Sequence, residues 1–167
     1  MDTAPPVLAF LLLGSNMGNR LRQLELACNM LQQPGIRVEK KSSVYETAPW
    51  GFEAAQSFFN MALQVRTQQL PQHLLQAAQQ VEQRLGRVRV AGAGYSSRPI
   101  DVDILFYGDE IIETPLLSVP HPRLHVRRFA LAPLAEIAPE LVHPALKKTV
   151  ATLLRECGDA GSVVRLG

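Results

Sequence analysis

The stretch VLAFLLLGSN, residues 7–16, decides how the rest of the chain is interpreted. Its continuous apolar part, residues 7–13, is much shorter than the roughly twenty residues that cross a membrane. Asp2 precedes it without a basic segment, which argues against a signal peptide. The run therefore predicts a buried central strand that ends in a tight turn at Gly14-Ser15-Asn16. The turn matches neither common phosphate-loop pattern, so a strand-to-helix turn is the better interpretation.

The segments that follow alternate between helical and strand periodicity. Apolar residues at Leu21, Leu24, Cys28 and Leu31 indicate an amphipathic helix that ends before Pro34. Strands are expected at 36–45, 58–65 and 100–107, one or two short strands at 110–118, and helices from 71 to about 85, at 127–138 and from about 148 to 157. This order predicts an α+β fold of the split βαβ type, an antiparallel sheet with helices on one face and the other face open for a site.

Composition limits the class of protein. The chain has 167 residues and a formal charge of +2, from 17 basic and 15 acidic residues. A single domain over residues 1–167 is expected, and neither a polybasic nucleic-acid binder nor a membrane-surface protein. Two distant cysteines, Cys28 and Cys157, suit a reduced, cytoplasmic protein better than a disulfide framework.

The most informative motif is RPIDVDI, residues 98–104. On a strand, Asp101 and Asp103 share one face, while Ile100, Val102, Ile104 and Phe106 share the other. Two adjacent carboxylates repel each other and suit Mg²⁺, which takes its remaining ligands from water and phosphates. The bland alternative is a strand face with two solvated charges. Arg98 beside the pair, with Arg87 and Arg89 at the other end of a glycine-containing loop, favours polyphosphate chemistry instead.

Seven landmarks in order carry a resemblance to a known family. They are Gly14-Ser15-Asn16, the segment 45–51 (YETAPWG), Phe58-Phe59-Asn60, Glu82 with the segment 86–89 (GRVR), Arg98-x-x-Asp-x-Asp, the segment 119–123 (VPHPR), and Arg127-x-Phe129. From about Val7 to Pro144 the chain resembles 6-hydroxymethyl-7,8-dihydropterin pyrophosphokinase, an enzyme of folate synthesis that moves pyrophosphate from ATP to a pterin and releases AMP. The resemblance implies a ferredoxin-like α+β fold.

The resemblance also implies roles for individual residues. Asp101 and Asp103 match the pair that holds two Mg²⁺ ions, and Arg87 and Arg98 match the loop arginines on the phosphates. The expected ATP pocket comprises Gln79, Glu82, Ile104, Ser118, His121 and Arg127, with Arg89 as a weaker contributor. The expected pterin site comprises stacking rings Phe58 and Phe129, the amide of Asn60, groups near Thr47, Pro49 and Trp50, and Tyr95 as an apolar cover. Phe59 is an alternative to Phe58 as the ring that faces the pocket.

Several features leave alternatives open. The loop departs from the common family form at Val90, at Tyr95 and at Ser96-Ser97, where a Gly-Pro pair is usual. A pterin or nucleotide binder without activity would share the scaffold, and an RNA-binding module would share the split βαβ sheet. The low net charge and the two aspartates on the open face argue against RNA. The expected partners are therefore ATP and the pterin, with no nucleic acid and no membrane, and the expected state is a monomer.

Overall fold

The computed structural model describes residues 5–49, 54, 56–87 and 97–167. Its strands are β1 (Val7–Ser15), β2 (Ile36–Lys41), β3 (Val44–Thr47), β4 (Phe58–Thr67), β5 (Asp101–Tyr107), β6 (Ile112–Glu113), β7 (Ser118–Val119) and β8 (Val163–Leu166). Its helices are α1 (Arg20–Leu31), α2 (Pro71–Arg84), the 3-10 turn η1 (Leu124–Val126), α3 (Arg128–Ile137) and α4 (Val150–Glu156). No helix among these described residues is long and apolar enough to cross a membrane.

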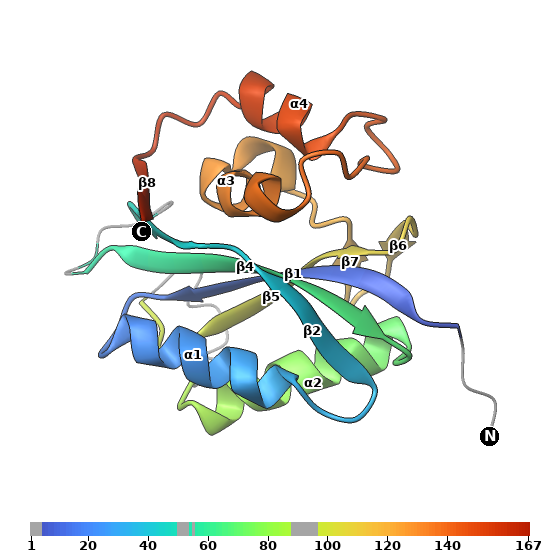
Figure 1. The fold of residues 1–167 in the computed structure, drawn as a ribbon, viewed down its shortest axis with the longest axis horizontal. Helices are drawn as coiled ribbons and strands as arrows, with labels where there is room; N and C mark the ends of the chain where they lie inside the picture. The colour runs from blue at the N-terminus through green and yellow to red at the C-terminus, as the bar shows by residue number, and fades with distance from the viewer. Residues whose placement is uncertain (1–4, 50–53, 55, 88–96) are drawn as a thin grey trace.

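One antiparallel sheet organises the molecule (Figure 1). Its strands run in the order β5-β1-β4-β3-β8, with β2 also paired to β4, and β6 and β7 form a separate ribbon. The apolar strand β1 is central, as the sequence predicts, and pairs with β4 along its whole length from Val7 opposite Thr67 to Ser15 opposite Phe59. The carboxyl end of β1 therefore lies beside the start of β4 and the start of β5.

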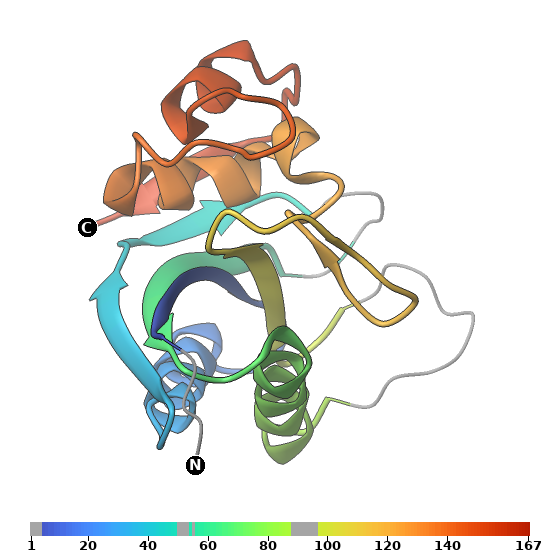
Figure 2. The ribbon, with the colours of Figure 1, turned by 90° about the vertical axis from the view of Figure 1, so that its right-hand side faces the viewer.

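Helices cover both faces of this sheet. Helices α1 and α2 pack below it in Figure 1, against a core that includes Leu11, Leu13 and Leu63. Helices α3 and α4 lie above it, against a second core around Phe10 and Phe106. Figure 2 shows the same layers end on, with the sheet between the two pairs of helices. The expectation of helices on one face holds for α1 and α2 only, because Leu12 and Ala62 make the opposite face apolar as well.

A register shift in β5 changes which face its side chains take. Ile104 lies opposite Leu11 and Phe106 opposite Phe10, so Leu105 is an extra residue in the ladder. Ile104 joins the core between the sheet and helices α1 and α2, whereas Leu105 and Phe106 join the core between the sheet and helices α3 and α4. The prediction that Phe106 shares a face with Ile104 is therefore wrong, because simple alternation does not continue through a bulge.

Two further elements differ from the sequence-based expectation. The strand expected at 36–45 is divided at Ser42, whose hydroxyl accepts a hydrogen bond from the backbone N–H of Ala62 at 2.9 Å. The short strand β8, which pairs with β3 from Val44 opposite Leu166 to Thr47 opposite Val163, was not expected at all. The other helices and strands confirm the expected segments to within a few residues at their ends.

Candidate active site

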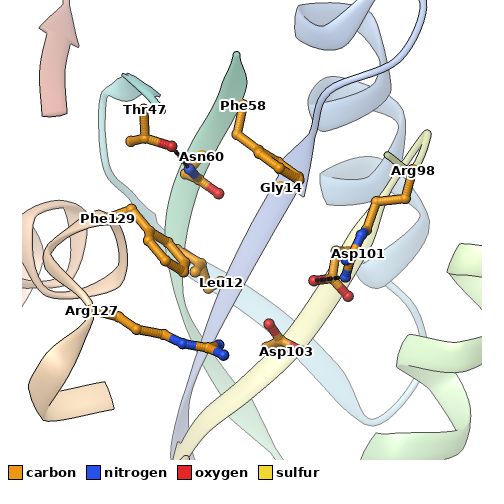
Figure 3. Close-up of a pocket in the computed structure, with 10 residues that line it drawn as sticks. All are labelled: Leu12, Gly14, Thr47, Phe58, Asn60, Arg98, Asp101, Asp103, Arg127 and Phe129. Carbon is orange, nitrogen blue, oxygen red and sulfur yellow. Dashed lines mark hydrogen bonds and ion pairs between the residues drawn. The ribbon is translucent and has the colours of Figure 1, made fainter. Parts of the chain in front are cut away.

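A cavity opens where the carboxyl end of β1 meets the starts of β4 and β5, on the face that α3 partly covers (Figure 3). The space within it and its opening to solvent together amount to about 500 Å³. Its walls bring together residues that are distant in sequence: Leu12, Gly14, Thr47, Phe58, Asn60, Arg98, Asp101, Asp103, Arg127 and Phe129. One end carries the side-chain amide of Asn60 and the ring of Phe58. The other end carries the carboxylates of Asp101 and Asp103 and the guanidinium of Arg127.

Asp101 and Asp103 project from the same side of β5 into this cavity, as the spacing predicts. Their surroundings differ. The Asp101 carboxylate pairs with Arg98 at 3.1 Å and also with Arg87. Burial alone would raise the pKa of Asp101, but these two arginines lower it overall. Asp101 is therefore held as a carboxylate at neutral pH.

The carboxyl of Asp103 makes no hydrogen bond or ion pair with any residue that the structure describes. Burial, followed by the charges of Asp101 and Glu82, raises its pKa to about 8. Two carboxyl groups thus lie side by side in a buried site, and a bound cation would relieve the repulsion between them. Over the same described residues, no cluster of three or more His, Cys, Asp or Glu side chains is arranged to hold a metal. The donor set is a pair of hard oxygen ligands, which fits Mg²⁺ that keeps water and phosphate ligands.

Buried polar side chains fix the two arginines behind the cavity. The Glu82 carboxylate accepts from the backbone N–H of Val102 at 2.9 Å and from Arg87 at 2.7 Å, and its side chain is only 2% exposed. Glu82 was expected in the ATP pocket, but the structure places it as a link between α2, Arg87 and β5. Asn16 grips the backbone of Arg98, accepting from its N–H at 2.7 Å and donating its own N–H to the Arg98 carbonyl at 3.2 Å.

The opposite end of the cavity combines two rings with one side-chain amide. The Asn60 amide donates to the Thr47 hydroxyl at 2.7 Å, which directs its oxygen toward Gly14. A Cβ at Gly14 would lie 2.7 Å from that oxygen, so only glycine leaves it accessible. Phe58 and Phe129 line the cavity. Phe59 faces the other side of the sheet and packs against the core between the sheet and helices α1 and α2.

A second hollow adjoins the first along β5. It is lined by Leu75, Gln79, Val102, Asp103, Ile104, Leu116, Leu117, Ser118, His121 and Pro122. Four of the residues expected to bind ATP are among these, and Asp103 lines both hollows. Burial, with the charges of Arg127 and Arg123, lowers the pKa of His121 to about 4. Its Nδ1 accepts from the backbone N–H of Arg123 at 3.3 Å, so a neutral ring with its hydrogen on Nε2 is expected.

Some expected residues lie elsewhere. Pro49 is half-buried but lines neither hollow, and Trp50, Arg89 and Tyr95 lie outside the described residues. Arg127, for which a role in ATP binding remains a prediction, lines the cavity with Phe129, and its guanidinium lies 5.6 Å from the centre of that ring. Sequence reasoning missed the clamp of Asn16 on Arg98. The sequence offers either Asn16 or Asn19, which follow the central strand, as a cap for the next helix; in the structure Asn19 caps α1 and Asn16 binds Arg98.

Comparison with known proteins identifies a family. The family model described as 7,8-dihydro-6-hydroxymethylpterin-pyrophosphokinase (HPPK) matches residues 10–139. A 2-amino-4-hydroxy-6-hydroxymethyldihydropteridine pyrophosphokinase of Aquifex aeolicus is 44% identical over 139 residues, which is 83% of this chain and 85% of that protein. The protein of the same name from Bacillus subtilis is 45% identical over 135 residues, 80% of each chain.

A solved structure has the same fold. The HPPK-DHPS of Plasmodium falciparum superposes with a TM-score of 0.74 at 17% identity, over 91% of this chain and 45% of the other. This chain thus spans less than half of that protein, and the likeness concerns the fold alone. From the family match, the relatives of similar length and the paired aspartates beside a ring-lined cavity, we conclude that the chain belongs to the 7,8-dihydro-6-hydroxymethylpterin-pyrophosphokinase family.

Proposed function

We propose that the cavity binds the pterin and that the adjoining hollow binds ATP. The pyrophosphoryl group is then transferred from ATP to the pterin beside Asp103. As a member of its family the chain is an ATP-dependent pyrophosphokinase that acts on hydroxymethyldihydropterin in folate synthesis. What remains to be assigned is the work of each residue. The observation that carries the assignment is that Asp103 lines both hollows, so a group held there can touch both substrates.

The ring-lined end of the cavity suits a flat heteroaromatic ligand. Phe58 and Phe129 offer faces for stacking, and the Asn60 amide offers an acceptor and a donor to the ligand edge. Because Thr47 accepts from the amide nitrogen at 2.7 Å, the amide is fixed before the ligand arrives. We therefore assign Asn60 and Thr47 to recognition of the polar pterin edge, with the hydroxymethyl group directed toward Asp101 and Asp103.

The hollow beyond Asp103 suits a nucleotide. Ile104 and Leu117 give it apolar walls, and Gln79, Ser118 and His121 give it polar groups for a base and a ribose. A neutral His121 donates a hydrogen bond to a phosphate oxygen without adding charge. Arg87 and Arg98 stand at the junction with Asp101, where the phosphates of ATP would arrive.

Asp101 and Asp103 are the residues that would hold Mg²⁺, and we propose two ions, as the family resemblance implies. Bound there with ATP, magnesium supplies neutralisation of the phosphate charge and alignment of the phosphate oxygens. The chain itself orients the pterin through Phe58, Phe129 and Asn60 and stabilises phosphate charge through Arg87 and Arg98. Catalysis then rests on positioning and electrostatics, without a covalent enzyme intermediate.

The transfer balances without a further reactant. The hydroxymethyl oxygen of the pterin forms a bond to the β-phosphorus of ATP as the bond from that phosphorus to the bridging α-phosphate oxygen breaks. The electron pair of the broken bond leaves with AMP, and the hydroxyl proton is released. Arg98, held at its backbone by Asn16, is placed to stabilise the phosphoryl oxygens during this exchange.

We also propose that residues 1–167 act as one pyrophosphokinase domain, that this domain works as a monomer, and that it binds no nucleic acid. The low net charge and the carboxylates at the site support the last point. A cytoplasmic location is proposed because ATP is available there and because Cys28 and Cys157 are both free thiols.

The test is a measurement of AMP released from ATP in the presence of 6-hydroxymethyl-7,8-dihydropterin and Mg²⁺. AMP and pterin pyrophosphate are expected in equal amounts, and both should stop when a chelator removes the metal. Asp103→Asn is the matched inactive variant. Release of ADP instead of AMP, or turnover unaffected by the chelator, would contradict the proposal. Binding of both substrates without turnover would favour the binder that the sequence left open.

A further inference from the structure

Arg20 is a positively charged residue at the first position of α1, where the helix dipole disfavours positive charge. Negative side chains favour the first turn of a helix, yet this turn has no acidic residue and carries Arg20 at its first position. Arg20 is nevertheless largely buried, with 19% of its side chain exposed. A charge that opposes its own helix and loses water needs compensating contacts elsewhere in the molecule.

Those contacts lie on the two strands that build the ring-lined end of the cavity. The Nη1 atom of Arg20 donates to the carbonyl oxygen of Ser57 at 2.8 Å and to its hydroxyl at 2.9 Å. The same atom lies 3.7 Å from a carboxylate oxygen of Glu46, which also accepts from the Ser57 hydroxyl at 2.8 Å. The guanidinium stacks on Phe59, 3.8 Å from the ring centre. One cation thus joins α1, β3 and β4.

The partners of Arg20 are the immediate sequence neighbours of cavity residues. Glu46 precedes Thr47, Ser57 precedes Phe58, and Phe59 lies between Phe58 and Asn60. Because side chains alternate between the faces of a strand, Arg20 grips the back of the same backbone that presents Thr47, Phe58 and Asn60 to the cavity. Glu46 and Phe59 are also register partners across β3 and β4, so the grip spans both strands.

We infer that Arg20 is a positioning residue that holds the pterin end of the cavity in its binding geometry from the far side of the sheet. The inference rests on the proposed assignment of that end to the pterin. Arg20 reaches the pterin only through the strands and does not face the nucleotide hollow, whose lining comes from α2, β5 and the segment 116–122. Substitution of Arg20 is therefore expected to weaken the binding of the pterin and to leave the binding of ATP nearly unchanged.

The first experiment measures the binding of each substrate separately. Arg20→Gln removes the charge and keeps a polar side chain of similar reach. We expect it to weaken binding of the pterin, followed by the pterin's own fluorescence, about tenfold, as loss of hydrogen bonds from a charged donor implies. The affinity for a non-hydrolysable ATP analogue is expected to change less than about twofold on the same reasoning.

Two further variants test whether the effect depends on the guanidinium of Arg20. Arg20→Lys keeps the attraction to Glu46 but loses the flat face that stacks on Phe59, so partial recovery of pterin affinity is expected. Arg22→Gln is the matched control, because Arg22 lies in the same turn with its side chain exposed. If Arg20→Gln does not fold, Ser57→Ala and Glu46→Gln remove its partners without touching the helix. Equal losses for both ligands, or no loss for either, would overturn the inference.

A second measurement is independent of the reaction. In the free protein, Arg20→Gln should speed amide hydrogen exchange at Glu46–Thr47 and Phe58–Asn60 but not in α2. If the unaltered protein binds no pterin, the proposed function fails, and exchange still decides whether Arg20 holds these strand ends. Unchanged exchange in the variant would contradict the positioning role.

Discussion

Asp101 and Asp103 are two residues apart on β5, yet substitution should affect them differently. Asp103→Asn removes a carboxyl without a described partner and relieves its repulsion with Asp101 and Glu82. We expect turnover to fall by at least about a hundredfold, as for other groups that organise transition-state charge. Without magnesium, the free energy of unfolding should stay the same or rise.

The matching change at Asp101 provides the contrast. Asp101→Asn leaves Arg87 and Arg98 without their shared carboxylate, so it should reduce both turnover and stability. Assays of AMP release and urea unfolding in chelator measure both quantities. Equal destabilisation by the two variants would show that Asp103 has a structural partner after all.

Phe129 should matter more to the pterin than to ATP. Stacking of an aromatic ring on a flat base contributes on the order of 1–3 kcal/mol, so Phe129→Ala should weaken pterin binding at least about fivefold. Phe129 is half-buried and also touches the core under α3, so thermal unfolding must be measured beside binding. Parallel losses for pterin and an ATP analogue would mean that the ring serves packing rather than recognition.

For individual residues, the sequence could predict which face of the strand the two carboxylates take but not which side chains surround them. A period of two was enough to put Asp101 and Asp103 on one face. Alternation could not decide between Phe58 and Phe59, because adjacent aromatic residues in a strand point to opposite faces and only the pairing with β1 and β3 says which face holds the cavity. Arg20 and Asn16 act across 37 and 82 positions of sequence, and no local pattern reveals such contacts.

Among the elements, α3 is tied to β3 by a single carboxylate. Glu136 accepts from the Tyr45 hydroxyl at 2.7 Å and from the Ser43 N–H at 2.9 Å, with Arg165 of β8 3.7 Å away. Burial opposes ionisation, but the bonds from Tyr45 and Ser43 prevail and lower the pKa of Glu136 below 4.5. The stabilisation is therefore complete above pH 4.5 and is lost as the pH falls through the lower folded-state pKa.

This link predicts a pH-dependent effect of substitution. Tyr45→Phe and Glu136→Gln should each reduce the free energy of unfolding at pH 7 by about 1 kcal/mol, a value discounted for solvent exposure. The difference from the unaltered protein should shrink below pH 4.5, where Glu136 becomes neutral in the unfolded chain first and then in the folded one. Urea unfolding at pH 7 and at pH 3.5 checks this, and a constant difference would argue against Glu136 as the titrating group.

Element order was predictable because each apolar run is long and its period clear. The failures have local causes. The strand expected at 36–45 is divided where the Ser42 hydroxyl takes a place in the ladder beside Ala62, and one serine gives little warning of that. The sequence of β8, with exposed Val164 and Leu166, resembles a frayed end, and it forms a strand because β3 offers it an edge.

For the whole molecule, β8 is the strand that closes one side of the sheet beside the pterin end. It pairs with β3 up to Thr47, and the carbonyl of Ser162 accepts from the Ala48 N–H at 3.2 Å. A chain shortened to end at Asp159 should lose about 1–3 kcal/mol of folding free energy. Its affinity for pterin should fall more than its affinity for ATP.

A matched control keeps β8 and changes only its exposed surface. Val164 is 51% exposed, and Val164→Thr retains strand propensity, so it should leave both affinities unchanged. Chemical denaturation and separate ligand titrations measure the two effects. If the shortened chain binds pterin as tightly as the full chain, β3 holds Thr47 without help from β8.

The extra residue in β5 sets the phase of the strand, so the effect of a deletion depends on where in the strand it falls. Before Leu105 the upper face carries carboxylates for the site; after it the same face carries Phe106 for the core beneath α3 and α4. Loss of the codon for Leu105 would remove the bulge and leave Ile104 and Phe106 as consecutive residues opposite Leu11 and Phe10, so Asp101, Asp103 and Phe106 would all keep their present face. Deletion of Val102, by contrast, would make Asp101 and Asp103 adjacent and place the two carboxylates on opposite faces, so β5 should tolerate the loss of one residue at the bulge and not at the start of the strand.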